Sequence, residues 1–394
     1  MIIGFLRSKN NPPKLARLLS HTCQYHDLTL IYMTPEGISM DKNTVKGKML
    51  ISNVWENVEV PLPKYIDVNP HLFSYKKYSE VMAYLQEKTK LSITRRNVIK
   101  KDVLQKELCN HSELNKYGIP SKNIKSFNEL LNFIYDNKRV VVKPVDGLQG
   151  KSVIVIKILD DENFVIGEQK EEKKYTKDEL HKFYELELQK SNYLMQKYIE
   201  SRTKMGDPFD CRIHMEKGAQ NKWNIANMFI RIGIGQSIVS NVSQGGGISK
   251  VPSFLEANFG TNAKQIEEKL KKMAIKMAVE IEKITDSQLA TMGLDVGIDL
   301  EGQLHVFEIN SFPIVSPQMA EITLIRPQYY KYMVKQGSKK RQEIDKKKRN
   351  SHLNSLKKEN SKLKREIEEL KNSTSWKITR PIRGVGKVLK KNKN

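Results

Sequence analysis

The chain has 394 residues, of which 39% are hydrophobic, so it is long enough to bury the cores of two or three domains. Its net charge of +23 is uneven, because residues 335–394 contain 21 Lys/Arg and only 6 Asp/Glu. No run approaches 18 apolar residues and the N-terminus has no signal-peptide core, so we expect no membrane span and a cytoplasmic location.

Residues 1–91 begin with a β-α-β pattern, which predicts a small α/β domain. A strand over 1–6 precedes a helix over 14–25, which Pro12-Pro13 opens, and a second strand follows at 28–32. Further short strands and a closing helix are predicted at 45–51, 58–60, 65–68 and 75–88. This region contains no assignable catalytic motif.

Residues 92–333 read as an α+β domain with antiparallel sheets covered by helices. A charged helical segment ends at Gly118-Ile119-Pro120, and a helix over 128–136 leads into a strand over 140–143. The remaining elements are strands at 152–158, 164–166, 193–199, 210–216 and 223–232, a long helix at 261–284, and a final hairpin.

Residues 334–373 carry a heptad pattern that predicts a coiled coil. The a positions are Leu353, Asn360 and Ile367, and the d positions are Leu356, Leu363 and Leu370. A single Asn at an a position favours a parallel homodimer in register, here over residues 350–373. The alternative is one amphipathic helix packed on the body of the protein.

The last segment, 374–394, mixes Trp376 and several aliphatic residues with many Lys/Arg. An aromatic anchor among basic residues suits an anionic membrane surface, whereas a solvated tail is the alternative. The stretch SWKITRPIR also resembles short C-terminal motifs of bacterial surface-polysaccharide enzymes. Specific nucleic-acid binding is not expected, because little aromatic interleaving is present for base stacking.

The sequence from Leu294 to Pro313 predicts a hairpin that carries two opposed carboxylates. With a turn at Glu301-Gly302, Asp295 lies opposite Glu308. One face would then carry Asp295, Gly297, Asp299, Glu308 and Asn310, and the other, core face would carry Leu294, Val296, Ile298, His305, Phe307 and Ile309. Facing carboxylates repel, and Mg²⁺ would relieve the repulsion. A solvated acidic face is the alternative.

A lysine at a strand end beside a Gly-rich loop is suited to holding phosphates. The strand VVVKP ends at Lys143 and runs into DGLQGKS, whose glycines are too close together for a P-loop. Lys106 precedes it and the carboxylate pair follows, and this order of cations and acids suits a nucleotide triphosphate with its metal. The widely spaced cysteines and the eight histidines form no metal-like cluster.

From about Ser92 to Tyr330 the chain resembles the ATP-grasp superfamily, and within it the endospore-coat-associated (YheC/YheD-like) group. The resemblance rests on VVVKPVDGLQGKSV, LMQKYI, PFDCRIHM, Trp223 with Arg231, SNVSQGGG and DVGIDLEGQLHVFEIN. The spacing of 13 residues from Asp295 to Glu308, with Asn310 two further on, matches the superfamily pattern. The flap departs from the group by having Val-Asp where Ile-Asn is frequent, and Lys106 is aligned only by its distance to Gly118-Ile119-Pro120.

The resemblance implies an α+β ATP-grasp fold in which two subdomains grip ATP, with one or two Mg²⁺ ions. Its implied nucleotide residues are Lys106, Lys143, Gly147, Gly150, Ser152, Gln196, Lys197 and Ile199. Its implied metal ligands are Asp295, Glu308 and Asn310. Asn241, Gly246 and Gly247 would form a substrate loop, unless that loop is a glycine-rich connection without chemistry.

Similarity to this superfamily also implies a carboxylate–amine ligase that works through an acyl phosphate. Arg212 and Arg231 are the cationic candidates for the carboxylate and the phosphoryl group, because guanidinium binds both in a bidentate manner. The alternative for each is a structural ion pair. The acceptor would be a small-molecule or polymer-borne carboxylate or amine, such as an amino acid or a uronic acid, used near the inner face of the membrane or in the spore coat.

A second reading is a non-catalytic coat or surface protein that keeps an ATP-grasp body as a scaffold. The near-complete set of phosphate and metal residues favours the enzyme over this alternative.

Overall fold

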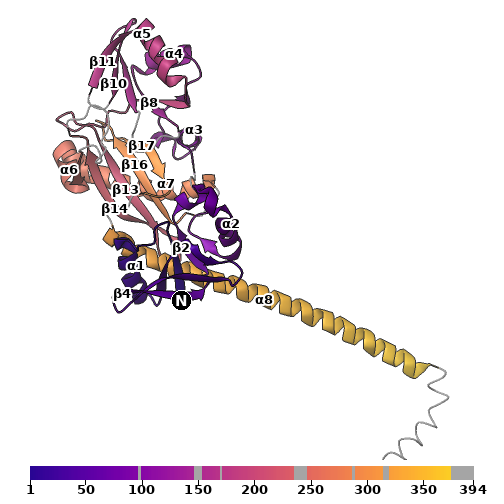
Figure 1. The fold of residues 1–394 in the computed structure, drawn as a ribbon. Helices are drawn as coiled ribbons and strands as arrows, with labels where there is room; N and C mark the ends of the chain where they lie inside the picture. Colours follow the sequence, from indigo (N-terminus) through magenta and orange to yellow (C-terminus); the bar gives the residue numbers. More distant parts are fainter. Residues whose placement is uncertain are drawn as a thin grey trace, which may run out of the picture. The chain divides into compact units, whose positions relative to one another are not determined.

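The computed structural model describes residues 1–95, 99–145, 153–168, 171–234, 246–285, 289–313 and 319–373, drawn in colour in Figure 1. Within these ranges the side chains of 101, 337–353, 370 and 371 are not described. The chain divides into two compact units, Met1–Val334 and Lys335–Asn394. Three sheets account for the strands that the structure describes, and all of them belong to the first unit.

The first sheet has the strand order β4-β3-β2-β1-β5-β6. Its strands are β1 (Ile2–Leu6), β2 (Thr29–Ser39), β3 (Thr44–Ile51), β4 (Val54–Pro61), β5 (Tyr65–Val68) and β6 (Lys90–Leu91). Strands β1, β2, β5 and β6 are parallel. Strand β3 is antiparallel to β2, and β4 is antiparallel to β3. This is the α/β arrangement that the early β-α-β pattern indicates.

Helices cover the first sheet with apolar residues. Helix α1 (Lys14–Tyr25) buries Leu15, Leu19 and Cys23, and these residues share a core cluster with Tyr329, Tyr330 and Met333 of α8 (Met319–Asn372). Helix α2 (Ser79–Lys88) packs in a second core cluster with β2, β3 and β5. Residues 1–91 therefore share their core with the start of α8, and their independence as a domain stays a prediction.

The second sheet has the order β11-β10-β9-β8-β12-β7 and is antiparallel throughout. Its strands are β7 (Ser121–Asn123), β8 (Arg139–Pro144), β9 (Ile154–Ile158), β10 (Asn163–Glu168), β11 (Glu171–Thr176) and β12 (Tyr193–Lys197). Helices α4 (Phe127–Asn137) and α5 (Lys177–Phe183) bury one face with Val140, Val142 and Met195. Because strand residues alternate, Val141, Lys143 and Gln196 lie on the opposite face.

The third sheet has the order β15-β14-β13-β16-β17, again antiparallel. Its strands are β13 (Phe209–Lys217), β14 (Trp223–Ile232), β15 (Gly247–Lys250), β16 (Thr291–Ile298) and β17 (Leu304–Asn310). Helix α6 (Val251–Phe259) and helix α7 (Ala263–Thr285) share its core cluster, α7 through residues such as Leu270, Met273 and Met277. Helix α3 (Lys101–Asn110) joins the same cluster through Leu104 and Leu108.

A buried network of charges ties α8 to two of the sheets. Arg326 of α8 donates to Glu216 of β13, with Nε 3.0 Å from Oε2, and its Nη1 lies 3.5 Å from Asp67 Oδ2 of β5. Arg7 also donates to Asp67 at 2.9 Å. Burial would raise the pKa values of Asp67 and Glu216, but the neighbouring guanidiniums, Arg7 first for Asp67 and Arg326 for Glu216, outweigh burial and lower them. Both carboxylates therefore stay charged inside the protein.

Beyond Val334, α8 continues as helix through residues 335–372. Residues 374–394, with the predicted membrane-binding segment, lie outside the described residues. In the part of the chain that is described, no helix is long and apolar enough to cross a membrane.

Candidate nucleotide and metal site

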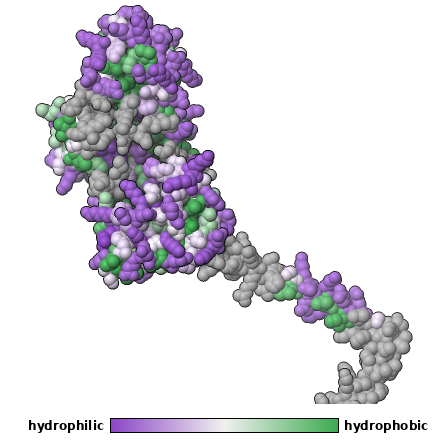
Figure 2. Space-filling view, viewed as in Figure 1, coloured by the Kyte–Doolittle hydropathy of each residue, from purple (hydrophilic) through white to green (hydrophobic). Residues whose placement is uncertain are grey.

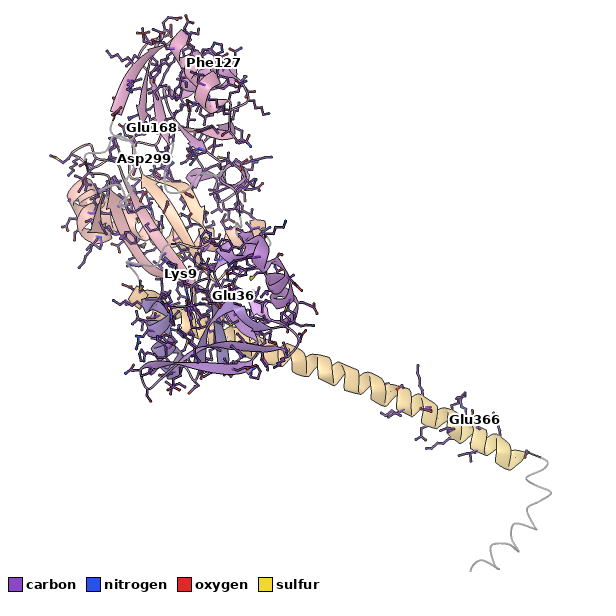
Figure 3. The ribbon with its side chains drawn as sticks, in the orientation of Figure 1. Lys9, Glu36, Phe127, Glu168, Asp299 and Glu366 are labelled. Atoms are coloured by element: carbon purple, nitrogen blue, oxygen red, sulfur yellow. The ribbon has the colours of Figure 1, made fainter. Side chains whose placement is uncertain are left out.

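The acidic hairpin forms, although the loop that joins its strands is longer than the predicted two-residue turn. Strands β16 and β17 are joined through residues 299–303, where the Gln303 amide donates to Asp299 Oδ1 at 2.7 Å and Gly302 adopts φ +74°. Glycine suits that conformation because it has no side chain to clash. Asp299 is labelled in Figure 3. Asp295 pairs with Glu308 in the ladder, so the predicted opposition of the two carboxylates is confirmed.

A β-bulge corrects the prediction for two other residues of the hairpin. Val296 pairs with Val306 whereas Asp295 pairs with Glu308, so Phe307 is the extra residue. Phe307 was predicted on the core face, but its ring lies over Gly297, where a Cβ would be 2.2 Å from it. His305 was also predicted on the core face, but it pairs with Gly297, and its Nε2 lies 2.8 Å from Asp299 Oδ2.

The bulge also explains why the carboxylates still meet. The loop is longer than the predicted two-residue turn, which shifts the register near the turn by one residue. The extra residue at Phe307 then restores the predicted register, so that Glu308 pairs with Asp295. The core face therefore carries Leu294, Val296, Ile298, Leu304, Val306 and Ile309, all buried or nearly so.

Two arginines neutralise Asp295, one from the adjacent strand and one from the strand beyond it. Arg212 of β13 is its ladder partner and makes a bidentate ion pair, with Nη2 3.0 Å from Oδ2. Arg231 of β14 approaches the same oxygen at 3.2 Å and also donates through Nε to Asp210 at 2.7 Å. Asp210, Arg212, Arg231, Asp295 and Glu308 thus form a row of charged residues across one face of the sheet, in which the two arginines lie among the carboxylates of Asp210 and Asp295 and Glu308 faces Asp295.

The ionisation of this row follows from burial and pairing together. Burial alone would raise the pKa of Asp295, but Arg212 and then Arg231 outweigh it and hold that pKa below its ordinary value. Burial would lower the pKa of Arg231, whereas Asp295 and Asp210 raise it well above the usual range. Asp295 is therefore ionised at neutral pH, and Arg231 is a cation beside it.

Lys143 connects the second sheet with the strand that carries Glu308. Its Nζ donates to Gln196 Oε1 at 2.9 Å, within the second sheet, and to the carbonyl oxygen of Phe307 at 3.4 Å, in the third. Phe307 immediately precedes Glu308, so the ammonium group lies beside the carboxylate pair. Gln196 is buried, and its Nε2 donates to Ser121 Oγ at 3.1 Å, which fixes the amide that holds the lysine.

Among the described hydrogen bonds, the segment after Gln196 leaves two backbone donors unused, the amides of Ile199 and Glu200. The Lys197 amide donates to the Pro120 carbonyl at 3.0 Å and the Tyr198 amide to the Arg139 carbonyl at 3.1 Å. Among the hydrogen bonds that the structure describes, none uses the Ile199 amide. Lys197 is exposed and Ile199 half-buried. This segment was predicted as the hinge that reads a nucleobase, and Ile199 retains the N–H that such a contact requires.

Lys106 lies on helix α3. Its neighbour Gln105 is buried and anchors α3, because it donates to the Val306 carbonyl at 2.7 Å and accepts from the Ile119 amide at 2.9 Å. Lys106 itself is exposed on the same helix. The structure thus places the helix next to β17 and leaves the phosphate role of Lys106 a prediction.

Several predicted residues cannot be placed in the site. Gly147, Gly150 and Ser152 of the flap and Asn241 of the substrate loop lie outside the described residues. Gly246 follows that gap directly, and Gly247 opens β15 by pairing with Ile232 of β14. Their predicted roles remain untested.

The chemistry of the donor set fits Mg²⁺ shared with phosphate oxygens. Asp295, Glu308 and Asn310 present carboxylate and amide oxygens on one face of two adjacent strands. In the described part of the chain, no group of three or more His, Cys, Asp or Glu residues could hold a metal ion. A protein-only cage is therefore absent there, whereas Mg²⁺ typically takes one or two carboxylates and completes its shell with water and phosphate.

Sequence reasoning missed Asp210, Gln105 and the placement of Phe307. The alternation of strand residues could have indicated Asp210, which lies two positions before Arg212 and so on the same face. Gln105 is a polar residue on a charged helix, and nothing in the pattern distinguishes it. The bulge at Phe307 depends on the length of the preceding loop, and the alternation of polar and apolar residues along the strand does not indicate it.

Comparisons with known proteins agree with this geometry. The family described as YheC/D-like ATP-grasp matches residues 90–335. The endospore coat-associated protein YheC of Bacillus subtilis is 24% identical over 346 residues, covering 81% of this chain and 92% of that protein. YheD of the same organism is 22% identical over 299 residues, covering 70% of this chain and 62% of that protein.

Among solved structures, D-cycloserine synthetase DcsG is similar with a TM-score of 0.49 at 12% identity, covering 85% of this chain and 99% of that chain. The family match confirms the resemblance predicted from the sequence and, with it, the mixed α+β ATP-grasp fold. The chain therefore belongs to the YheC/D-like ATP-grasp family.

Proposed function

We propose that the protein is an ATP- and Mg²⁺-dependent ligase that joins a carboxylate to an amine through an acyl phosphate. The observation that carries the proposal is the position of Lys143 Nζ, which contacts both Gln196 and the Phe307 carbonyl beside the Asp295–Glu308 pair. A lysine from one sheet and a pair of carboxylates from another thus converge. This is the charge arrangement that phosphoryl transfer needs.

The nucleotide would lie against the faces of the second and third sheets that meet at Lys143. Lys143 would contact the phosphates, with Lys106 and the flap residues Gly147, Gly150 and Ser152 completing their environment. The Ile199 amide donates to no acceptor in the described part of the chain and would be available to the base, and the Phe307 ring offers the base an apolar surface over Gly297. Both features support nucleotide binding beside Lys143.

Asp295, Glu308 and Asn310 would hold Mg²⁺, which would neutralise the phosphate charge and align the reacting oxygens. Arg212 and Arg231 would bind the substrate carboxylate and the transferring phosphoryl group. Asp210 already fixes Arg231 through two hydrogen bonds, so this guanidinium is oriented before any ligand arrives. Catalysis would then consist of alignment and charge neutralisation.

The substrates would be a carboxylate and an amine used in spore-coat or cell-surface polymer assembly. YheC and YheD, the two similar proteins, are named as endospore coat-associated, which supports the coat as the setting. A loop containing Asn241, Gly246 and Gly247 would contact the acceptor. Phosphate release screened against amino acids and uronic acids would identify the pair.

A non-catalytic coat component with an ATP-grasp scaffold is the second candidate. It is favoured by the ion pairs of Asp295, whose carboxylate is satisfied by two arginines without any ligand. The two candidates differ in whether Mg·ATP binds and turns over.

The discriminating experiment measures binding and turnover separately. The wild type should show a thermal shift with Mg·ATP and release ADP when its substrates are present. Asp295→Asn combined with Glu308→Gln should abolish ADP release, whereas Glu301→Gln at the exposed turn, a matched carboxylate control, should not. Release that survives the double substitution would contradict the proposed site, and a wild type without any thermal shift would favour the scaffold.

A further inference from the structure

The described part of α8 beyond Val334 exposes a stripe of large apolar side chains. Leu356, Leu363 and Ile367 are 47%, 51% and 51% exposed. Figure 2 shows this stripe as apolar patches on an otherwise hydrophilic helix surface. Every residue from 354 to 369 is exposed, so nothing within the second unit covers the stripe in the part of that unit that the structure describes. Such a face needs an occupant, because exposed leucines in a row favour association.

The width of the stripe identifies the kind of occupant. Apolar residues occupy only the a and d positions of the heptads, and the flanking positions are charged: Lys357 and Lys364 at e, Glu359 and Glu366 at g. A helix that packs on a globular body usually adds apolar residues at e or g, whereas a strict a/d seam is typical of a coiled coil. The seam therefore fits another helix with the same narrow face.

The charges beside the seam select a second copy of this helix in the parallel orientation. In a parallel pair, g of one chain faces the following e of the other, so Glu359 meets Lys364 of the second copy. The next such pair is Glu366 with the e position at residue 371, which is also a lysine. An antiparallel pair would instead place g against g and e against e, where like charges repel. Glu366 is labelled in Figure 3.

Asn360 fixes the register of the pair. It occupies the middle a position and is exposed in the single chain, where water satisfies its amide. In the seam, its amide is satisfied only opposite another Asn, which occurs only when the two chains are parallel and unshifted. A shift of one heptad would bury Asn360 against an aliphatic residue.

We propose that α8 pairs with α8 of a second copy as a parallel, in-register, two-stranded coiled coil over residues 353–370. The protein is then a homodimer whose two copies are joined by this helix. The proposal is independent of the ligase activity, because none of its residues belongs to the nucleotide site.

Light scattering of the full-length protein tests the association. The mass should be twice the 45.5 kDa of one chain. Leu363→Glu should return it to one chain, whereas Ser361→Glu, which adds the same charge at an outward b position, should leave the dimer intact. A wild-type mass of one chain would overturn the proposal, as would a mass of three chains or an unchanged mass for Leu363→Glu. Unchanged thermal unfolding of the body would show that the variants are folded.

Cysteine cross-linking tests the orientation and the register. In a Cys109→Ser background, which removes the exposed native thiol, Leu363→Cys at a d position should form a disulfide-linked dimer on mild oxidation, because it keeps Asn360. Ser361→Cys, two residues away on the outer face, should not. Linkage at 361 and not at 363, or linkage at neither, would contradict the parallel, in-register pair.

Charge reversal tests the role of the flanking pairs. Lys364→Glu should weaken dimerisation about tenfold, because two repulsive contacts replace two attractive ones. Adding Glu359→Lys should restore the wild-type dissociation constant. Equal weakening by the single and the double substitution would refute the assigned pairing.

Discussion

Asp295→Asn tests how much the negative charge of Asp295 contributes to the row of charged residues across the third sheet. The substitution preserves the shape of the side chain but removes the negative charge that faces Arg212 and Arg231. The carboxylate is 8% exposed, and the two guanidiniums are 12% and 16% exposed, so solvent screens the interaction little. We therefore expect a loss of stability in the third sheet.

The size of this loss follows from the partners that remain. Removing one member of a buried ion pair typically costs about 3–5 kcal/mol. Arg231 keeps Asp210, which favours the lower end, and the repulsion between Asp295 and Glu308 disappears, which returns up to about 1 kcal/mol. We predict a decrease in the free energy of unfolding of about 2–3 kcal/mol.

The pH dependence gives the prediction a second signature. Because the folded pKa of Asp295 is below its ordinary value of 3.8, its contribution is fully present above that value. It is lost as pH falls through the lower folded pKa. The difference between the wild type and Asp295→Asn should therefore be constant from about pH 5 to 8 and shrink below about pH 4.

Urea denaturation followed by tryptophan fluorescence measures this effect, because Trp223 is buried in the same sheet. A double-mutant cycle with Arg212→Met should show that the two substitutions together cost less than their sum. Additive costs, or a loss below about 1 kcal/mol for Asp295→Asn alone, would refute the assigned network.

Three further predictions concern other parts of the chain. Arg326→Met should cost about 3 kcal/mol or more, because it leaves the buried carboxylate of Glu216 without its guanidinium partner, although Asp67 keeps Arg7, while Lys331→Met in an exposed pair should leave the urea midpoint unchanged. Gly297→Ala should lower both stability and Mg·ATP affinity, since the added Cβ would displace the Phe307 ring; unchanged calorimetric affinity would contradict this placement. Deletion of 373–394 should preserve ATP turnover and abolish sedimentation with anionic liposomes, and unchanged sedimentation would remove the membrane proposal.

Much of the secondary structure was predictable because hydrophobic periodicity records burial. Helix α1 and strands β5 and β14 begin and end where the pattern places them. Strand β11 was missed, since it is an edge strand that is exposed along almost its whole length and shows no alternation. Helix α6 and strand β15 were missed as well, next to the glycine-rich loop where the pattern is short.

The candidate site was predictable only in part. Alternation along the final hairpin placed Asp295 opposite Glu308, because a period of two fixes which residues share a face. The contact of Lys143 with Phe307 spans 164 residues, and no local pattern encodes such a distance. Predicting the ion pairs of Asp295 would have required the order of strands β14, β13 and β16 in the sheet, which no local sequence pattern gives. Predicting the bulge would have required the length of the loop between β16 and β17.

Titration of the wild type and Lys143→Met with Mg·ATP by calorimetry tests the central claim most directly. Loss of a charge-assisted hydrogen bond to phosphate removes about 1.5–3 kcal/mol, so the dissociation constant should rise between about tenfold and 150-fold. Lys197→Met, on the neighbouring strand but exposed, serves as a comparison for loss of a positive charge and should weaken binding less. Equal affinity of the wild type and Lys143→Met, or no binding by the wild type, would contradict the nucleotide site.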